Sequence, residues 1–382
     1  MVEHVGKPKV RFAGFTEAWE QRKLGDLAEF NPKAELPTNF EYVDLESVVG
    51  TELINHRTQT KYTAPSRAQR LAQYGDLFYQ LVRPYQKNNY LFELNSENFV
   101  FSTGYAQLRP SVDGYFLMSL VQNEYFVQKV LDNCTGTSYP AINVNDLAEI
   151  NVYTSLKKSE QARIGTFFRQ LDRLITLHQR KRERLENIKK AMLEKMFPKN
   201  GADVPEVRFA GFTEAWEQRK LGEVSSEFKS GEFIQADCIK LEGDYPVYGG
   251  NGLRGYTDCY NHDGEYALIG RQGALCGNMN YSSGKAYFTE HAVAVKANTS
   301  NNTRFLYYLL ETMNLGQYSG QSAQPGLAVG NLIELETRFP KKEEQARIGT
   351  FFRHLDRLIT LHQRKVELLQ NIKKACLEAM FV

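Results

Sequence analysis

The 382-residue sequence has few of the residues that build disulfide frameworks or zinc sites. Its five cysteines are an odd number, widely scattered and without a Cys-x-x-Cys pair, so free, buried thiols are the expectation. No run of 18 apolar residues occurs, and the first ten residues lack the apolar core of an export signal. We therefore expect a cytoplasmic protein that has no contact with a membrane.

Motifs for catalysis are also missing. A Gly-x-x-x-x-Gly-Lys-Ser/Thr phosphate loop is absent, and the tetrad needed for methyl transfer to a base is approached only by Asn31-Pro32-Lys33. His291 stands beside Glu290, but successive residues of a strand point to opposite faces and would not act as an acid/base pair. We predict a non-catalytic chain that binds no metal and no cofactor of its own.

Charge is unevenly distributed. The net charge is only +2, yet residues 157–197 carry 12 Lys/Arg against 5 Asp/Glu, and residues 341–381 carry 9 against 5. The rest of the chain is therefore at −9. If the chain binds a polyanion, local patches or partner subunits must supply the neutralising charge.

The most informative feature is a double repeat. Residues 10–25 and 207–222 both read VRFAGFTEAWEQRKLG, and residues 160–181 return as residues 344–365 with Gln170 replaced by His354 as the one change. The enclosed stretches, 26–159 and 223–343, differ in length (134 against 121 residues) and share little that can be aligned. This pattern indicates one constant task performed twice and two different tasks between. Trp19 and Trp216, the only tryptophans, fit a core anchor better than a partner contact.

Residues 160–197 and 344–381 are the clearest helices, because they contain no proline and are rich in helix-forming residues. Apolar residues recur at steps of 3 and 4, which predicts that the two helices wind around each other. The chain order favours an antiparallel pair in which each helix of about 36 residues spans on the order of 50 Å. The predicted pairing residues are Phe167, Leu171, Leu174, Leu185 and Ile188 with Phe351, Leu355, Leu358, Leu369 and Ile372.

Polar residues interrupt each apolar seam at its middle: His178 with Lys181, and His362 with Lys365. They either fix the register of the pair or extend from the edge of an imperfect stripe. Both interpretations stay open at this point.

The two enclosed stretches read as mixed α/β domains with many short strands. Three short segments recur in the same order, and the alignment puts Arg83 opposite Arg271 and Gly104-Tyr105 opposite Glu290-His291. The fold class predicted is therefore mixed α/β with a pseudo-two-fold internal repeat. Its predicted parts are a first variable domain (1–156), a first helix with linker (157–199), a second variable domain (200–340) and a second helix (341–382).

The framing copies FAGFTEAWEQRKLG, the EQxRIGxFF helices and the segment YPVYGGNG (245–252) resemble the specificity subunit of type I restriction-modification systems. The resemblance extends over essentially the whole chain. It implies two target-recognition domains, each reading one half of a split DNA site, with the helices setting the spacer. It further implies two methyltransferase (modification) subunits, two restriction subunits, and S-adenosylmethionine, ATP and Mg bound by those partners.

Candidate DNA contacts are polar and aromatic side chains on probable loops. In the first variable domain they are Arg83, Tyr85, Gln86, Lys87, Asn88, Thr103, Tyr105, Thr137, Ser138 and Tyr139. In the second they are Tyr248, Asn251, Arg254, Tyr256, Arg271, Gln272, His291, Gln321, Ser322 and Gln324.

Plainer explanations stand beside these assignments. An arginine on the surface can simply form an ion pair, and glycine-rich loops can simply make turns. For the whole chain, the alternative is a coiled-coil scaffold that assembles other proteins without reading DNA. A self-sufficient methyltransferase is disfavoured by the missing motifs.

Overall fold

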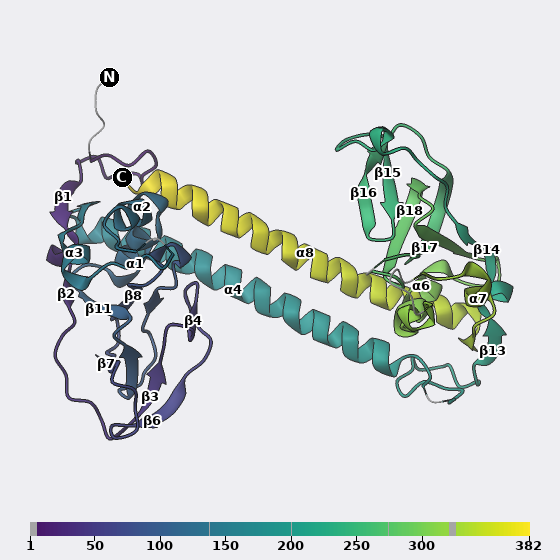
Figure 1. Cartoon of the computed structure of the whole chain (residues 1–382), viewed down its shortest axis with the longest axis horizontal. Helices are drawn as coiled ribbons and strands as arrows, with labels where there is room; N and C mark the ends of the chain where they lie inside the picture. The colour runs from purple at the N-terminus through teal and green to yellow at the C-terminus, as the bar shows by residue number, and fades with distance from the viewer. Residues whose placement is uncertain (1–5, 137, 200, 274, 321–325) are drawn as a thin grey trace. The chain divides into compact units, whose positions relative to one another are not determined.

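The computed structural model describes residues 6–136, 138–199, 201–273, 275–320 and 326–382, and these form two compact units (Figure 1). Unit 1 comprises Met1–Gln179 and Arg364–Val382, and unit 2 comprises Arg180–Gln363. The two long helices, α4 (Lys158–Lys195) and α8 (Lys342–Met380), each contribute one part to each unit. Each unit thus contains one variable stretch and portions of both helices.

Unit 1 holds the following further elements, in chain order: β1 (Glu20–Lys23), η1 (Leu24–Asp26), β2 (Ala28–Phe30), β3 (Asn39–Val43), β4 (Val48–Val49), β5 (Glu52–Leu53), β6 (Arg57–Thr60), β7 (Ala68–Leu71), β8 (Leu77–Gln80), η2 (Pro84–Gln86), β9 (Tyr90–Leu91), β10 (Phe99–Ser102), β11 (Tyr105–Pro110), α1 (Gly114–Gln122), α2 (Glu124–Asp132), α3 (Val144–Glu149) and β12 (Asn151–Thr154).

Two four-stranded sheets face each other in unit 1. Their strand orders are β2-β11-β8-β9 and β6-β3-β10-β7. An aromatic core fills the space between them, where the rings of Phe78 and Phe101 stack at 3.6 Å. The other face of β8 and β11 packs against α1, α2 and the start of α4. Because β8 and β11 are covered on both sides, their side chains are buried at successive positions.

Unit 2 holds these further elements, in chain order: β13 (Glu217–Lys220), α5 (Leu221–Val224), β14 (Ser225–Ser230), η3 (Ala236–Cys238), β15 (Tyr245–Gly249), β16 (Gly252–Thr257), β17 (His262–Gly270), β18 (Met279–Phe288), β19 (Ala292–Ala297), α6 (Thr303–Thr312), η4 (Leu315–Tyr318), α7 (Val329–Ile333) and β20 (Glu336–Phe339).

One six-stranded sheet, β14-β19-β17-β18-β15-β16, forms the body of unit 2. Helix α6 and the nearby part of α8 cover one face, where Ile269 and Val293 pack with Phe305 and Phe352. The opposite face carries a smaller aromatic cluster that includes Phe288. The mixed α/β fold class predicted from the sequence is confirmed, whereas the predicted domain boundaries remain a prediction.

The constant segments frame both units in the same way. Strand β1 pairs with β12, the strand before α4, and β13 pairs with β20, the strand before α8. Arg11 binds the buried carboxylate of Glu160, and Arg208 binds that of Glu344 at 2.7 Å. Both tryptophans of the repeat are buried in the cores, which confirms the core interpretation.

Helices α4 and α8 pair antiparallel within each unit. In unit 1, Lys373 of α8 forms an ion pair with Asp172 of α4 (2.6 Å). In unit 2, Lys189 of α4 forms the corresponding pair with Asp356 of α8 (3.0 Å). The predicted antiparallel arrangement is therefore present in both units.

Burial along the two helices follows the predicted seam only in part. Phe168 and Ile175 are buried, whereas the predicted pairing residue Leu174 is exposed and Phe167 is half-buried. The apolar residues of α4 form two neighbouring stripes, and the sequence pattern alone does not decide which one faces the paired helix. Of the other predicted positions, Leu171 and Leu355 are buried, Leu185, Phe351 and Leu369 are half-buried, and Ile188, Leu358 and Ile372 are exposed.

The polar interruptions lie beside the seam. His178 and His362 are half-buried and both have interaction partners, while Lys181 and Lys365 are exposed. Arg182 of α4 donates a hydrogen bond to the side-chain oxygen of Gln363. The lysines therefore extend from the edge of an imperfect apolar stripe and do not fix the register of the pair, because they are exposed.

The early glycine of each helix permits a close approach. A Cβ atom at Gly165 would overlap the carboxylate of Asp113 and would lie 2.9 Å from the backbone nitrogen of Phe116. Asp113 caps α1 by accepting a hydrogen bond from that nitrogen. At the equivalent Gly349, a Cβ would lie 3.1 Å from the capping oxygen of Asn302. Glycine thus lets the start of α4 and α8 abut the capped end of the neighbouring helix.

Candidate nucleic-acid interface

The first candidate site is the loop that follows β8 in unit 1. It contains the short helix η2, flanked by Arg83 (φ 54°) and Lys87 (φ 55°), which both adopt the left-handed conformation. Residues other than glycine seldom adopt this conformation, and a residue before proline normally favours extended backbone. Two such residues around a single helical turn indicate a loop held in place by its surroundings.

Buried amides beneath the loop supply that support. Gln80 is buried, and its side-chain nitrogen donates to the side-chain oxygen of Gln86 (3.0 Å) and to the carbonyl oxygen of Val82 (2.5 Å). The backbone nitrogen of Gln80 donates to Asn89, which is also buried. No sequence pattern identified Gln80 or Asn89 as functional, because a single buried amide leaves no periodic signal.

The predicted contact residues Lys87 and Asn88 are engaged within unit 1. Lys87 forms an ion pair with Glu124 (2.7 Å), and Asn88 accepts a hydrogen bond from the backbone of Gly50 (2.8 Å). Tyr85 is exposed and projects from the single turn of η2. The loop therefore exposes an aromatic ring while its lysine is already neutralised.

A second loop lies against the first. Val82 forms an isolated β-bridge with Ala141, and the backbone nitrogen of Arg83 donates to the carbonyl oxygen of Pro140 (2.7 Å). The Arg83 guanidinium carbon lies 4.3 Å from the centre of the Tyr139 ring, and Tyr139 is 64% exposed. Ser138 is exposed as well, and Thr137 lies outside the described residues. The structure thus brings the two predicted loops of unit 1 together.

Two further predicted contacts, Thr103 and Tyr105, lie just before and at the start of β11. Tyr105 is fully buried between the two sheets, and its hydroxyl donates to the carbonyl oxygen of Asp44 (3.4 Å). The prediction that Tyr105 contacts DNA is therefore wrong, because it has no accessible surface. Thr103 is half-buried and its backbone nitrogen donates to Arg67 (2.8 Å).

In unit 2 the end of β17 meets the turn before β19. His291 Nδ1 lies 3.1 Å from the side-chain oxygen of Gln272, and His291 Nε2 lies 3.2 Å from Glu290. The expectation that Glu290 and His291 point apart is wrong, because they occupy a turn and not a strand. Gln272 also bridges Gly326, which links this cluster to the loop before α7.

The structure corrects the alignment of the two arginines. Arg271 N donates to the carbonyl of His291 (2.9 Å), just as Leu81 N donates to the carbonyl of Gly104 (2.9 Å). Arg271 is therefore the counterpart of Leu81, and Arg83 lies two positions beyond that point. The two compared segments, 75–83 and 264–271, contain nine and eight residues, so matching their final arginines by eye shifts the register of the strands.

The remaining predicted contacts of unit 2 belong to the β15–β16 hairpin. Asn251 and Arg254 are exposed, Tyr256 is half-buried, and Tyr248 packs on Phe288 at 6.1 Å. Glycines at this hairpin allow the tight turn, as at Gly252 (φ 90°). Gln321, Ser322 and Gln324 lie outside the described residues.

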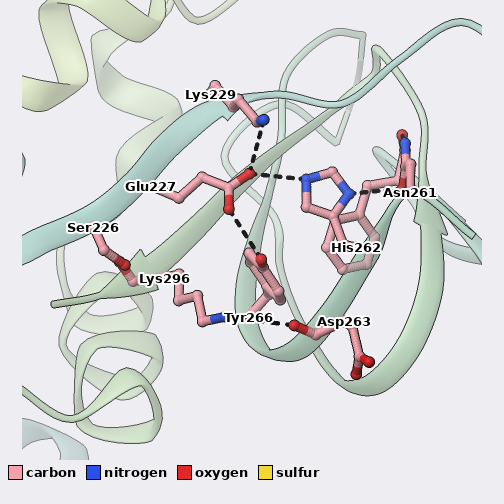
Figure 2. Close-up of polar contacts among 9 residues, drawn as sticks. Ser226, Glu227, Lys229, Asn261, His262, Asp263, Tyr266 and Lys296 are labelled. Atoms are coloured by element: carbon pink, nitrogen blue, oxygen red, sulfur yellow. Dashed lines mark hydrogen bonds and ion pairs between the residues drawn. The ribbon is translucent and has the colours of Figure 1, made fainter. Parts of the chain in front are cut away.

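A polar cluster occupies the second face of the unit 2 sheet (Figure 2). Glu227 accepts hydrogen bonds from Tyr266 (2.9 Å) and contacts His262 Nε2 (3.0 Å) and Lys229 (3.2 Å). Burial opposes ionisation of Glu227, but bonds from Tyr266 and Lys229 and the charge of His262 outweigh it and lower its pKa. The backbone of Phe288 fixes the Asn261 amide so that its oxygen faces His262 Nδ1 (2.7 Å).

The polar groups of this cluster bind one another, so we assign it a structural role in holding β14 to β17.

In the described parts of the chain, no group of three or more His, Cys, Asp or Glu could hold a metal ion. The same residues include no helix that is both long and apolar enough to span a membrane. All five cysteines are free, and Cys238 and Cys259 are exposed, against the expectation that the thiols are buried.

Comparison with known proteins points to one family. Residues 16–187 and 213–371 match the family model described as type I restriction modification DNA specificity domain. The Escherichia coli type I restriction enzyme EcoprrI specificity subunit is 42% identical over 163 residues, which cover 42% of this chain and 39% of that relative. The Methanocaldococcus jannaschii type I restriction enzyme MjaIX specificity subunit is 27% identical over 191 residues, 44% of each chain. These matches thus span less than half the length of the curated relatives.

A solved structure shares the fold over nearly the full length. The crystal structure of the type I restriction-modification system S subunit from M. genitalium superposes with a TM-score of 0.74 at 16% identity, covering 98% of this chain and 99% of the other. With both variable stretches and both copies of the helix repeat inside the matched segments, the chain belongs to the type I restriction modification DNA specificity family.

Proposed function

We propose that this chain is a sequence-specific DNA-binding subunit in which each unit reads one half of a bipartite site. The observation that carries the proposal is that the two units repeat the same framing strands and ion pair but differ in their loops. Both units hold their loops on the same frame, with β1–β12 and Arg11–Glu160 repeated as β13–β20 and Arg208–Glu344. A protein that only assembled partners would have no need for two such different loop sets on one frame.

The loops differ in the chemistry that they would offer to bases. Unit 1 offers an arginine and a tyrosine in cation–π contact, Arg83 and Tyr139, whereas unit 2 offers the pair of Gln272 and His291. Side chains of these types recognise different base edges in the major groove. The two halves of the site are therefore expected to differ in sequence.

A binding experiment tests this proposal. The chain, purified with its modification subunit, is presented with a pool of random duplexes and the bound fraction is sequenced. We expect enrichment of two short defined sequences separated by an undefined spacer of constant length. Enrichment of no sequence, or of one continuous sequence, would contradict the proposal.

We further propose that modification subunits dock on the long helices. Within unit 1, Leu174 and Leu177 of α4 and Leu368 and Ile372 of α8 are all exposed. Exposed leucines repeated along a helix form an apolar stripe that a partner helix can cover. Unit 2 repeats the pattern with Ile188 of α4 and with Leu358 and Leu361 of α8. Two equivalent stripes fit two copies of one partner.

The resemblance to type I specificity subunits supports the rest of the assembly. On this proposal, two methyltransferase subunits would bind S-adenosylmethionine, and two restriction subunits would bind ATP and Mg. The helices, which belong in part to each unit, would set the spacer between the half-sites. This chain would select the site and would leave the chemistry to its partners.

A further inference from the structure

In the two loops around Arg83, residues 81–92 and 134–141, Arg83 is the described cation that has no ion pair. In the described residues, no carboxylate lies within ion-pair distance of Arg83, which excludes the surface ion pair as its role. Lys87, the other cation of these loops, is bound to Glu124 at 2.7 Å. A guanidinium is always charged and keeps its five N–H donors in one plane.

The position of Arg83 is set by its backbone and by its contact with Tyr139. The left-handed φ of 54°, the hydrogen bond from its N–H to Pro140 and the bridge between Val82 and Ala141 determine where the side chain starts. Tyr139 holds the guanidinium at 4.3 Å by a cation–π contact. No other described residue pairs with the guanidinium N–H donors of Arg83, so these donors are available to a ligand.

We propose that Arg83 reads a guanine in the half-site of unit 1 by donating two hydrogen bonds to N7 and O6 in the major groove. This proposal rests on the proposed function and assigns a specificity-determining residue to one unit. The paired donors of an arginine match the spacing of these two acceptors, and guanine is the base that presents both. A guanidinium already held against an aromatic ring loses less entropy on binding than a free one, which suits base recognition.

A phosphate contact fits the loop less well. Proteins hold the DNA backbone with several mobile cations, yet the segments 81–92 and 134–141 contain only Arg83 and Lys87, and Lys87 is paired. The groups around Arg83 are the exposed Tyr85 and Tyr139 and the amide of Gln86. Gln86 is exposed, and its side-chain oxygen accepts from the buried Gln80 (3.0 Å). This is the composition of a surface that reads base edges.

Unit 2 has no arginine at the equivalent position. Gln272 bridges Gly326 as Val82 bridges Ala141, so the residue after Gln272, Gly273, is the counterpart of Arg83. The contact is thus expected in one half of the site only. The natural glycine of unit 2 also identifies the best variant for a test, because glycine accepts the left-handed conformation without strain.

The test uses the chain in complex with its modification subunit and compares Arg83→Gly and Arg83→Lys with the wild type. Random duplexes are selected by binding, and the affinity for single-base changes in the selected site is measured. We expect both variants to lose discrimination on the order of 10-fold to 100-fold at one guanine of one half-site, with the other half-site unchanged. Lysine keeps the charge and lacks the paired donors, so it separates base reading from phosphate binding.

Two further measurements sharpen the result. Replacing that guanine by 7-deazaguanine removes the N7 acceptor, and this should weaken binding of the wild type but leave binding of Arg83→Gly unchanged. Tyr139→Phe should keep the discrimination because the ring remains, whereas Tyr139→Ala should lower it. Thermal unfolding of each variant verifies that unit 1 is folded.

The outcomes separate this proposal from the proposed function. If the wild type selects a bipartite site and Arg83→Lys discriminates as well as the wild type, Arg83 does not read a guanine. The same conclusion follows if Arg83→Gly weakens binding to all sequences equally. If the wild type selects no bipartite site at all, the proposed function fails and this inference fails with it.

Discussion

The backbone N–H of Val10 donates a hydrogen bond to the carbonyl oxygen of Ala379 at 2.9 Å, which joins the first constant segment to the last turn of α8. Val207 donates the same bond to Lys195 at 2.9 Å in unit 2. There the two residues are close in the chain, whereas Val10 and Ala379 come from segments far apart in it. The core of unit 1 therefore depends on residues contributed by α8 and by Phe381, which follows it.

The first prediction concerns Phe381, whose ring packs on Trp19 (5.9 Å), Phe116 (5.6 Å) and Phe168 (6.0 Å). Phe381→Ala should destabilise unit 1 by about 3–5 kcal/mol, the usual loss for a buried phenylalanine. Urea unfolding followed by Trp19 fluorescence in a Trp216→Phe background measures this change.

Phe197→Ala is the matched control in unit 2, because Phe197 packs on Trp216 (6.1 Å), Phe305 (5.6 Å) and Phe352 (6.0 Å). It should shift unfolding reported by Trp216 and leave the Trp19 transition in place. Equal effects of both variants on both tryptophans would show that the chain unfolds as one body, against the division into two units.

The second prediction is a pH dependence at Glu160. Burial opposes the ionised form, but hydrogen bonds from Arg11, Ser155 and Trp19 outweigh it, so the pKa of Glu160 is lowered on folding. Stability from this carboxylate is complete above its unfolded pKa of about 4.3 and is lost as the pH falls through the lower folded pKa. Glu160→Gln should therefore cost about 3–5 kcal/mol near neutral pH.

The difference in unfolding free energy between wild type and Glu160→Gln is measured from pH 7 downward. We expect it to shrink in acid, because the wild-type carboxyl is then protonated and resembles the amide. A difference that stays constant down to the acid limit of folding would mean that the ion pair with Arg11 does not stabilise unit 1.

The third prediction compares two glycines in the same sequence context. Gly165→Ala should cost about 1–3 kcal/mol, because the new methyl group overlaps the Asp113 carboxylate that caps α1. Gly349→Ala should cost less than about 1 kcal/mol, because its methyl group would lie 3.1 Å from Asn302 and alanine favours the helix. Chemical denaturation of both variants tests the order, and a larger loss at Gly349 would refute it.

The fourth prediction tests the apolar stripe of α4. Leu177→Lys places a charge on the exposed stripe and should weaken assembly with the modification subunit at least tenfold, without lowering the unfolding temperature of the free chain. Gln128→Lys, at an exposed position on α2 and outside the long helices, is the control. Size-exclusion chromatography or calorimetry reports assembly, and equal binding by both variants would remove the stripe from the proposed interface.

The repeat in the sequence predicted much of this fold because it marks what both units share. Both long helices and both buried tryptophans follow from it directly. The repeat could also have indicated the buried ion pair of Arg11 and Glu160, since both residues recur unchanged as Arg208 and Glu344. An arginine and a glutamate are common on surfaces, and only the packing shows that these carboxylates are buried.

The contact residues were harder to predict for physical reasons. Strand β11 is covered on both faces, so Tyr105 is buried where alternation would allow an exposed tyrosine. In α4, Ile175 and Leu174 are equally apolar, and only the position of α8 decides which of them is buried. The cation–π contact of Arg83 with Tyr139 joins two loops that are distant in sequence, so no local pattern predicts it.

The central claim is that each unit reads its own half of a split site. Its most direct test replaces the unit 1 loops, residues 81–92 and 134–141, with those of a family member of different specificity and maps the methylated sequences in cells that also carry the modification subunit. We expect one half of the bipartite sequence to change while the other half and the spacer are retained. A change in both halves, or in neither, would contradict it.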